Sequence, residues 1–377
     1  MAELYLLKHR IMSEHIRTTV ENGLARLTLD RPEAMNSLSL HMVRTLAEKL
    51  GAWQHDSAIR AVVIDSSLPK AFCAGGDIRF FHEVAQGGLT GGSALLEDFF
   101  TEEYALNHLI HHYPKPYIAV MDGIVMGGGM GISQGASLRI VTPRTKMAMP
   151  ETAIGLFPDV GGGWFLARCP GRVGEYLALT GDVIDAERAI RWGLADAELP
   201  IDRLQSTWDG LQDASLTDAA ALTAWLNAQV ARTAKPGGTA NAEAISKAVD
   251  RHFAHDSVAA VVASLEASTD AWEAKTAATL RQRSPLMLHV TLELVRRARD
   301  LTLAEDLRLE RDLMRHCFQL RPGAASETVE GIRALAVDKD HSPRWNPARI
   351  EAVRAEDVAP FFVSPWPAHA HPLRDLA

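Results

Sequence analysis

The chain has 377 residues, of which 47% are hydrophobic, and a net charge of −8 with mixed signs. This composition supplies a sizeable core, gives no basic stripe for nucleic acid, and contains no run of about eighteen apolar residues that would cross a bilayer. Cys73, Cys169 and Cys317 are far apart and form no CxxC pair, so we expect reduced, buried thiols rather than disulfides or a zinc site. The N-terminal sequence contains no cleavable apolar leader, so we expect a cytoplasmic protein.

The first predicted element is a β-hairpin. Alternating residues over 17–20 and 25–29 flank Asn22-Gly23, which is typical of a two-residue hairpin turn. Residues before Met12 carry no clear pattern, so they are read as a flexible leader or as sequence upstream of the natural start. Ser39 is then the expected N-cap of a helix whose apolar residues follow three-and-four spacing as far as Trp53.

Two continuous apolar runs, 61–64 and 117–121, predict buried strands. Each run is followed within about ten residues by glycines, at 75–76 and at 127–129. Helices between such strands imply crossover connections and a largely parallel sheet. Ligands would then bind near the carboxyl ends of the strands.

After about Leu204 the strand signals fade and the sequence becomes helical in character. Ser284 and Pro285 are the expected N-cap and first residue of one helix, and a second helix is predicted over 303–318. The Lys-Pro-Gly-Gly within 234–242 predicts a loop rather than a domain linker. We expect this half to form a helical layer that packs on the first half.

Three glycine-rich segments carry the chemistry: residues 71–78, 126–131 and 150–163. Together they resemble the crotonase (enoyl-CoA hydratase/isomerase) superfamily, whose members bind acyl-CoA thioesters. The run 151–163 is similar, almost residue for residue, to the 3-hydroxyisobutyryl-CoA hydrolase branch. Further similarity comes from 102–104, 330–333 and 338–340, and the resemblance covers roughly 14–347.

The resemblance implies an α/β fold with a crotonase-like core of repeated ββα units and a C-terminal helical region. The expected division is a catalytic, acyl-CoA-binding core over 12–204, a helical region over 205–350 and a tail over 351–377. The expected partner is an acyl-CoA small molecule, with no nucleic acid and no membrane. Superfamily members are often trimers or hexamers, so a homo-oligomer is also expected, although the helical half could occupy the surface that such assemblies use.

Gly76 and Gly128 are the expected oxyanion hole. A thioester carbonyl under attack develops negative charge on its oxygen, and two converging backbone N–H groups stabilise that charge. Glycine lets the backbone approach closely because it has no Cβ. By resemblance, the N–H groups of Gly76 and Gly128 fill this role, the second at a helix N-terminus; the alternative is that the glycines are only tight turns.

Hydrolysis also needs a carboxylate that activates water or attacks the carbonyl. By resemblance this group is Glu151, with Asp159 as a second acid/base or orienting residue and Glu103 at the acyl end of the substrate. The alternative for each is a solvated surface charge, and Glu102-Glu103 reads equally as an exposed pair on a helix. Apolar residues between 154 and 157 favour a buried setting for Glu151 and Asp159.

Gly131 bears on the type of reaction. Hydratases of the superfamily generally carry a glutamate there, so the usual hydratase pair is incomplete, although isomerases also lack it. The favoured function is therefore an acyl-CoA thioester hydrolase, acting on 3-hydroxyisobutyryl-CoA in valine degradation. The alternatives are an enoyl-CoA hydratase or isomerase and a non-catalytic acyl-CoA-binding protein.

Two other motifs match the patterns of known sites. Residues 131–135 fit GxSxG, but a nucleophile elbow places its serine directly after a strand, whereas Ser133 is expected inside a helix. His108, His111 and His112 have a helical spacing that metal ligands use, but a helix C-terminus explains them as well. We expect no metal and no cofactor beyond the CoA of the substrate.

Overall fold

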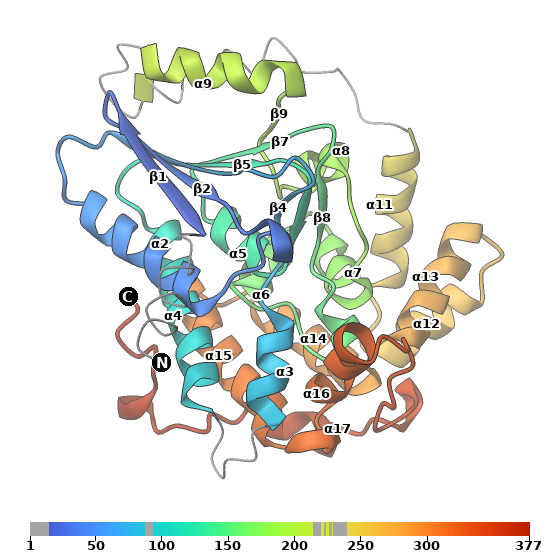
Figure 1. Ribbon diagram of the computed structural model, residues 1–377. Helices are drawn as coiled ribbons and strands as arrows, with labels where there is room; N and C mark the ends of the chain where they lie inside the picture. The colour runs from blue at the N-terminus through green and yellow to red at the C-terminus, as the bar shows by residue number, and fades with distance from the viewer. Residues whose placement is uncertain (1–14, 87–92, 214–219, 222–223, 226–227, 229–239) are drawn as a thin grey trace.

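The computed structural model describes residues 15–86, 93–213, 220–221, 224–225, 228 and 240–377. Its strands form a larger sheet in the order β1-β2-β3-β5-β7-β9 and a smaller sheet in the order β4-β6-β8 (Figure 1). All neighbouring strands are parallel except β1 and β2. The strands are β1 (Ile16–Glu21), β2 (Leu24–Leu29), β3 (Ala61–Ser66), β4 (Ala71–Cys73), β5 (Tyr117–Met121), β6 (Ile124–Met126), β7 (Leu138–Val141), β8 (Lys146–Ala148) and β9 (Ala197–Glu198).

The first hairpin has the predicted turn. β1 pairs with β2 from Ile16 opposite Leu29 to Glu21 opposite Leu24, which leaves Asn22-Gly23 as the two turn residues. Both have positive φ, 49° and 77°, which a type I′ turn requires and Asn-Gly adopts readily. The hairpin prediction is confirmed.

The apolar runs form the centre of the larger sheet. Residues 61–64 of β3 and 117–121 of β5 are all buried, which explains why their sequences are continuously apolar instead of alternating. The strand pairs β1–β2, β3–β4 and β5–β6 each lead into a helix. The expected α/β core of ββα units with a parallel sheet is confirmed.

The helices form most of the remaining structure. In the first half they are α2 (Leu40–Trp53), α3 (Ile78–Gln86), α4 (Ala94–His111), α5 (Gly128–Gln134), α6 (Gly162–Ala167), α7 (Val173–Thr180), α8 (Ala186–Arg191) and α9 (Leu204–Asp213), with a short turn η2 (Glu151–Ile154). In the second half they are α11 (Ala240–His252), α12 (Val258–Glu266), α13 (Ala271–Gln282), α14 (Pro285–Arg297), α15 (Leu303–Gln319), α16 (Glu327–Ile332) and α17 (Ala355–Val358). Figure 1 shows the later helices, in orange and red, on the side of the sheets that α3, α4 and α6 occupy.

Side-chain caps set the starts of the predicted helices. Ser39 accepts a hydrogen bond from the backbone of Met42, and Ser284 accepts one from Met287 with Pro285 as the first helical residue. α15 begins with a capping box at Thr302, which gives this long helix a defined start.

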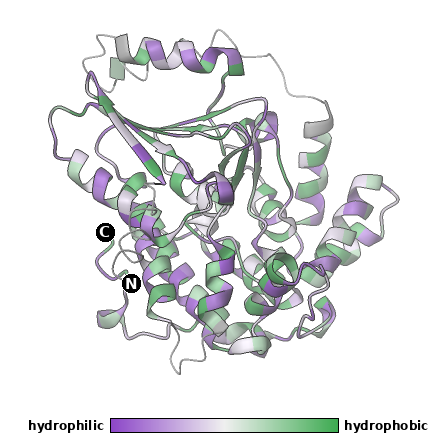
Figure 2. Cartoon of the chain, in the orientation of Figure 1, coloured by the Kyte–Doolittle hydropathy of each residue, from purple (hydrophilic) through white to green (hydrophobic). Residues whose placement is uncertain are grey.

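The outer face of the larger sheet is covered by α9, which lies above the strands in Figure 1. Trp208 and Leu211 of α9 pack in a second, smaller core with residues of β2, β3, β5 and β7. The outer helices are banded with hydrophilic and hydrophobic residues (Figure 2), as expected for helices that bury one face. The main core is continuous from Ile16 to Leu373 and joins the two halves of the chain.

One loop prediction needs correction. The loop expected over 234–242 lies outside the described residues as far as 239, but residues 240–242 form the first turn of α11. The helix-forming alanine and charged residues that follow allow α11 to begin inside the segment that the Lys-Pro-Gly-Gly sequence predicted to be a loop. The leader before Met12 also lies outside the described residues. No helix in the described part of the chain is long and apolar enough to span a membrane.

Candidate active site

Glu103 and Tyr104 lie on the buried face of α4. Their exposed fractions are 2% and 0%. The preceding Glu102 is half-buried and pairs instead with Arg44 of α2, at 2.6 Å between the side chains. The reading of Glu102-Glu103 as an exposed charge pair is therefore wrong for Glu103. Its Oε1 atom has no hydrogen-bond partner in the described structure.

The two candidate oxyanion glycines meet at one edge of the smaller sheet. β4 and β6 are parallel neighbours, so the turns that follow them, at Gly76 and Gly128, lie side by side. A Cβ built on Gly128 would lie 3.5 Å from the Gly76 nitrogen and 2.7 Å from Glu103 Oε1. Glycine at 128 thus leaves room between an amide and a carboxyl group.

The amides of these glycines are free for a ligand. Neither Gly76 N–H nor Gly128 N–H donates a hydrogen bond within the described part of the chain. Gly128 begins α5, and the preceding Gly127 has a φ of 47°, a left-handed conformation that favours glycine. These glycines do form tight turns, and the turns also leave two unbonded N–H groups at one place.

Glu151 and Asp159 come from the chain that follows β8. Glu151 opens η2, and each carboxyl-bearing residue is 7% exposed. A Cβ on Gly127 would lie 2.8 Å from Glu151 Oε1, while Glu151 Oε2 has no partner in the described structure. Tyr104 Oη donates a 2.8 Å hydrogen bond to Asp159 Oδ2. The fold therefore brings these carboxyl groups to the glycine turns and to the buried face of α4.

Burial raises the pKa of all three carboxyl groups. The pKa of Glu151 and of Glu103 lies well above the usual range, through burial and then the negative charge of Asp159. Burial raises the pKa of Asp159 to about 6, and the Tyr104 hydrogen bond opposes that rise. Carboxyl groups with raised pKa values that lie together in a buried site are typical of acid/base catalysis.

The space beside Gly131 is filled by Val160. A Cβ on Gly131 would lie 2.7 Å from Val160 Cβ and 3.0 Å from Asn107 Nδ2. Val160 is 3% exposed and has a φ of 58°, which is rare for a β-branched residue. A glutamate at 131, such as hydratases carry, has no room in this arrangement.

Two further carboxyl groups, which the sequence reading missed, lie behind the loop of Asp159. Glu310 and Asp306 of α15 are completely buried and accept hydrogen bonds from backbone amides of residues 161–164. Their spacing in the sequence could have predicted their burial, because both acids lie on the apolar face of α15 among Leu303, Leu307 and Leu313. Charged residues on such a face require partners.

Neither of the other motifs forms a site of its own. Ser133 lies inside α5 and donates a 2.8 Å hydrogen bond to the carbonyl of Gly129, so it is not the nucleophile of an elbow. His108 and His111 are in the last turn of α4 and His112 caps it, which agrees with the explanation of these histidines by a helix C-terminus. No group of three or more potential ligands among the described residues is arranged to hold a metal ion.

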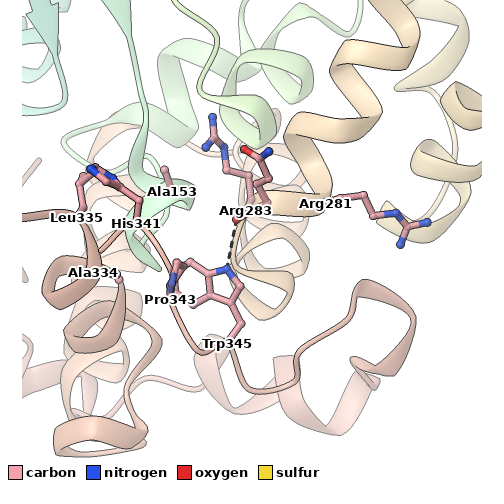
Figure 3. Close-up of a pocket in the computed structure, with 10 residues that line it drawn as sticks. Ala153, Arg281, Arg283, Ala334, Leu335, His341, Pro343 and Trp345 are labelled. Carbon is pink, nitrogen blue, oxygen red and sulfur yellow. Dashed lines mark hydrogen bonds between the residues drawn. The ribbon is translucent and has the colours of Figure 1, made fainter. Parts of the chain in front are cut away.

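A surface pocket of about 390 Å³ lies next to η2, and it is lined by Ala153, Gly331, the end of α13 and the segment after α16. Figure 3 shows Arg281 extending away from the other lining residues, and Trp345 Nε1 donates to the carbonyl of Gln282. Arg283 donates to the carbonyl of Thr180. None of the candidate carboxyl groups lines this pocket, so it is distinct from their site.

Proteins of known family have sequences similar to that of this chain. Residues 24–362 match the family model described as enoyl-CoA hydratase/isomerase. The chain is 37% identical to the mitochondrial 3-hydroxyisobutyryl-CoA hydrolase of Danio rerio, over 90% of this chain and 86% of that protein. It is 34% identical to the probable 3-hydroxyisobutyryl-CoA hydrolase 3 of Arabidopsis thaliana, over 89% and 88%.

Two solved structures are similar over nearly their whole length. A carnitinyl-CoA dehydratase from Mycobacterium thermoresistibile has a TM-score of 0.84 and 36% identity, covering 96% of this chain and 99% of that chain. An enoyl-CoA hydratase from Rhodobacter sphaeroides 2.4.1 has a TM-score of 0.81 and 36% identity, covering 93% and 98%.

The comparisons overturn one expectation and confirm another. The expected cytoplasmic location is wrong by this evidence, because the relatives from Danio rerio, Xenopus tropicalis and Rattus norvegicus are all named as mitochondrial. Absence of an apolar leader was a poor guide, because organelle targeting segments are amphipathic rather than apolar. The resemblance read from the glycine motifs is confirmed: the chain belongs to the enoyl-CoA hydratase/isomerase family.

Proposed function

We propose that this protein hydrolyses 3-hydroxyisobutyryl-CoA to 3-hydroxyisobutyrate and CoA, the step that releases the acid from CoA in valine degradation. The observation that carries the proposal is the meeting of two buried carboxyl groups, Glu151 and Asp159, with two glycine turns whose amides are unbonded. Relatives named for this activity, at 32% to 37% identity, support the choice of substrate.

In this proposal the amides of Gly76 and Gly128 hold the thioester oxygen. They stabilise the charge that develops when the carbonyl is attacked, and losing one such donor typically costs about 3 kcal/mol of transition-state stabilisation. Both are backbone groups on rigid turns, so they need no rearrangement during the reaction. Glu103, with its unbonded Oε1 beside Gly128, receives the acyl end and suits a hydroxyl donor.

Glu151 then acts in one of two ways. As a base, its carboxylate takes a proton from water while the water oxygen bonds to the carbonyl carbon, the carbon–sulfur bond breaks, and the sulfur leaves as the thiol after protonation. As a nucleophile, it forms an anhydride with release of CoA, and water then opens the anhydride. In the first route the proton that Glu151 takes from water passes to the leaving sulfur. In the second route Glu151 carries no proton as an anhydride, so Asp159 donates a proton to the leaving sulfur and takes one back from the water that opens the anhydride.

Hydration or isomerisation of an enoyl-CoA is the second candidate, because the two similar solved structures are named as a carnitinyl-CoA dehydratase and an enoyl-CoA hydratase. Val160 counts against hydration, since it occupies the place of the second hydratase carboxylate. A non-catalytic acyl-CoA-binding protein is disfavoured by burial of both Glu151 and Asp159, which is costly and unnecessary for binding alone. No cofactor is proposed beyond the CoA of the substrate, and a homo-oligomer remains part of the proposal.

The test is a paired assay on one enzyme preparation. Free-thiol release from 3-hydroxyisobutyryl-CoA is measured beside hydration of crotonyl-CoA. Thiol release with negligible hydration supports the hydrolase. Hydration without thiol release supports the second candidate, and neither reaction despite measured acyl-CoA binding supports the non-catalytic reading.

A further inference from the structure

The turn that carries Asp159 has an unusual backbone. The next residue, Val160, has a φ of 58°, and Gly161 follows at 85°. Glycine adopts such angles freely, but a β-branched residue does so only when the surrounding structure imposes it. Its side chain is consequently directed against Gly131, and Asp159 is presented to Tyr104.

Two acids of the C-terminal half impose this conformation. Glu310 accepts hydrogen bonds from the amides of Gly161 at 2.7 Å and Gly163 at 2.9 Å, one to each carboxyl oxygen. Asp306, one helical turn earlier on α15, accepts a 2.8 Å bond from the amide of Trp164. Three amides of one short segment are therefore held by one face of α15.

No cation is paired directly with either of these acids in the described part of the chain. Both are fully buried, and the cationic charge of Arg168 lowers the pKa of Asp306 without forming an ion pair with it. Burial, and then the negative charge of Asp306, raises the pKa of Glu310 well above its usual range. Burial raises the pKa of Asp306 to about 7, although Glu310, the Trp164 amide and the charge of Arg168 oppose that rise. A buried carboxyl group is costly, so its retention points to the amides that it binds.

We propose that Glu310 is a positioning residue for Asp159: through the amides of Gly161 and Gly163 it holds the turn in the form that presents Asp159 to the substrate. This inference rests on the proposed function, since it assumes that Asp159 acts on the thioester. It makes α15 part of the catalytic machinery, although Glu310 itself does not touch the reacting atoms. It also explains why a chain of this family carries carboxyl groups on the apolar face of a C-terminal helix.

The test begins with Glu310→Gln. The amide keeps the size of the side chain but turns an NH₂ group toward one of the two backbone N–H groups, so one hydrogen bond is lost and the turn relaxes. A shift of about 1 Å at a catalytic group lowers turnover up to about a hundredfold, so kcat should fall tenfold or more while KM changes little. Glu305→Gln, an exposed acid on the same helix, is the matched control and should leave kcat unchanged.

A rescue separates positioning from general loss of structure. Val160→Gly removes the residue that resists the left-handed conformation, so the turn should hold its form with fewer hydrogen bonds. The loss in kcat caused by Glu310→Gln should therefore be smaller in the Val160→Gly background than in the wild-type chain. An equal loss in both backgrounds would show that Glu310 does not act through this turn, as would a folded Glu310→Gln enzyme with wild-type kcat.

Two more variants complete the experiment. If Glu310→Gln does not fold, Glu310→Asp keeps the charge and withdraws it from the amides, and the same kcat loss and rescue are expected. Asp159→Asn separates the catalytic role of Asp159 from the positioning role of Glu310. Full turnover in Asp159→Asn contradicts the catalytic role of Asp159 that this inference assumes, whereas an impaired Asp159→Asn beside an unimpaired Glu310→Gln contradicts only the positioning role. Absence of thiol release in the wild-type enzyme would instead contradict the proposed function itself.

Discussion

Gly131→Ala tests whether the space beside this glycine is truly occupied. The added methyl carbon would lie 2.7 Å and 2.9 Å from two carbons of Val160, and 3.0 Å from Asn107 Nδ2. Ordinary carbon contacts are about 3.5 Å or longer, so Val160 must retreat by about 0.8 Å. The hydrogen bonds of Glu310 to Gly161 and Gly163 resist that movement.

The size of the effect follows from these contacts. Overpacking of a rigid site costs up to about 3 kcal/mol, and replacing glycine by alanine inside a helix returns about 1 kcal/mol, so the unfolding free energy should fall by up to about 2 kcal/mol. If Val160 does move, Asp159 moves with it, and a displacement near 1 Å lowers kcat by up to about a hundredfold.

Urea denaturation and thiol-release kinetics measure the two effects. Gly51→Ala is the matched control, because Gly51 lies in α2 and a Cβ there meets nothing within 4 Å. It should stabilise the protein by about 1 kcal/mol and leave activity unchanged. The reasoning is refuted if Gly131→Ala is as stable and as active as Gly51→Ala.

Three further outcomes are expected. Dialysis against EDTA should leave thiol release intact, and a loss restored by zinc would show that the histidines of α4 were misjudged. Ser133→Ala should retain most turnover, since the Ser133 hydroxyl donates to the carbonyls of Gly129 and Met130 within its own helix; a loss of about a thousandfold, as for a triad residue, would favour a serine hydrolase. In the proposed mechanism the carboxylate form of Glu151 is the reactive one, and burial and then the charge of Asp159 raise its pKa, so kcat/KM should fall as pH drops through that pKa. Asp159→Asn removes the neighbouring charge and should move this fall to lower pH in a pH–rate profile, and a midpoint that stays in place contradicts the coupling.

Features set by neighbouring residues were predictable from the sequence. Asn22-Gly23 specifies its turn, Ser39 and Ser284 cap their helices, and the apolar runs form buried strands because each depends on chemistry within a few residues. The glycine turns also followed, because parallel strands place them at one edge of a sheet.

Features set by distant contacts were not predictable in this way. Glu310 binds the amide of Gly161 across 149 positions in the sequence, and Tyr104 binds Asp159 across 55. Periodicity alone left it open whether Glu102 or Glu103 faces the interior, because that depends on how α4 packs against α2 and α15. The left-handed Val160 is a further case, since no local signal marks a β-branched residue for that conformation.

Single-turnover hydrolysis of 3-hydroxyisobutyryl-CoA by Glu151→Gln tests the catalytic proposal most directly. Glutamine keeps nearly the same volume but removes the basic and nucleophilic form, so the rate constant should fall by at least about a hundredfold. Acyl-CoA binding, measured on the same preparation, should change little because the glycine amides still hold the carbonyl. A folded variant that binds acyl-CoA and hydrolyses it at the wild-type rate would contradict the catalytic role of Glu151 and the hydrolytic site built around it.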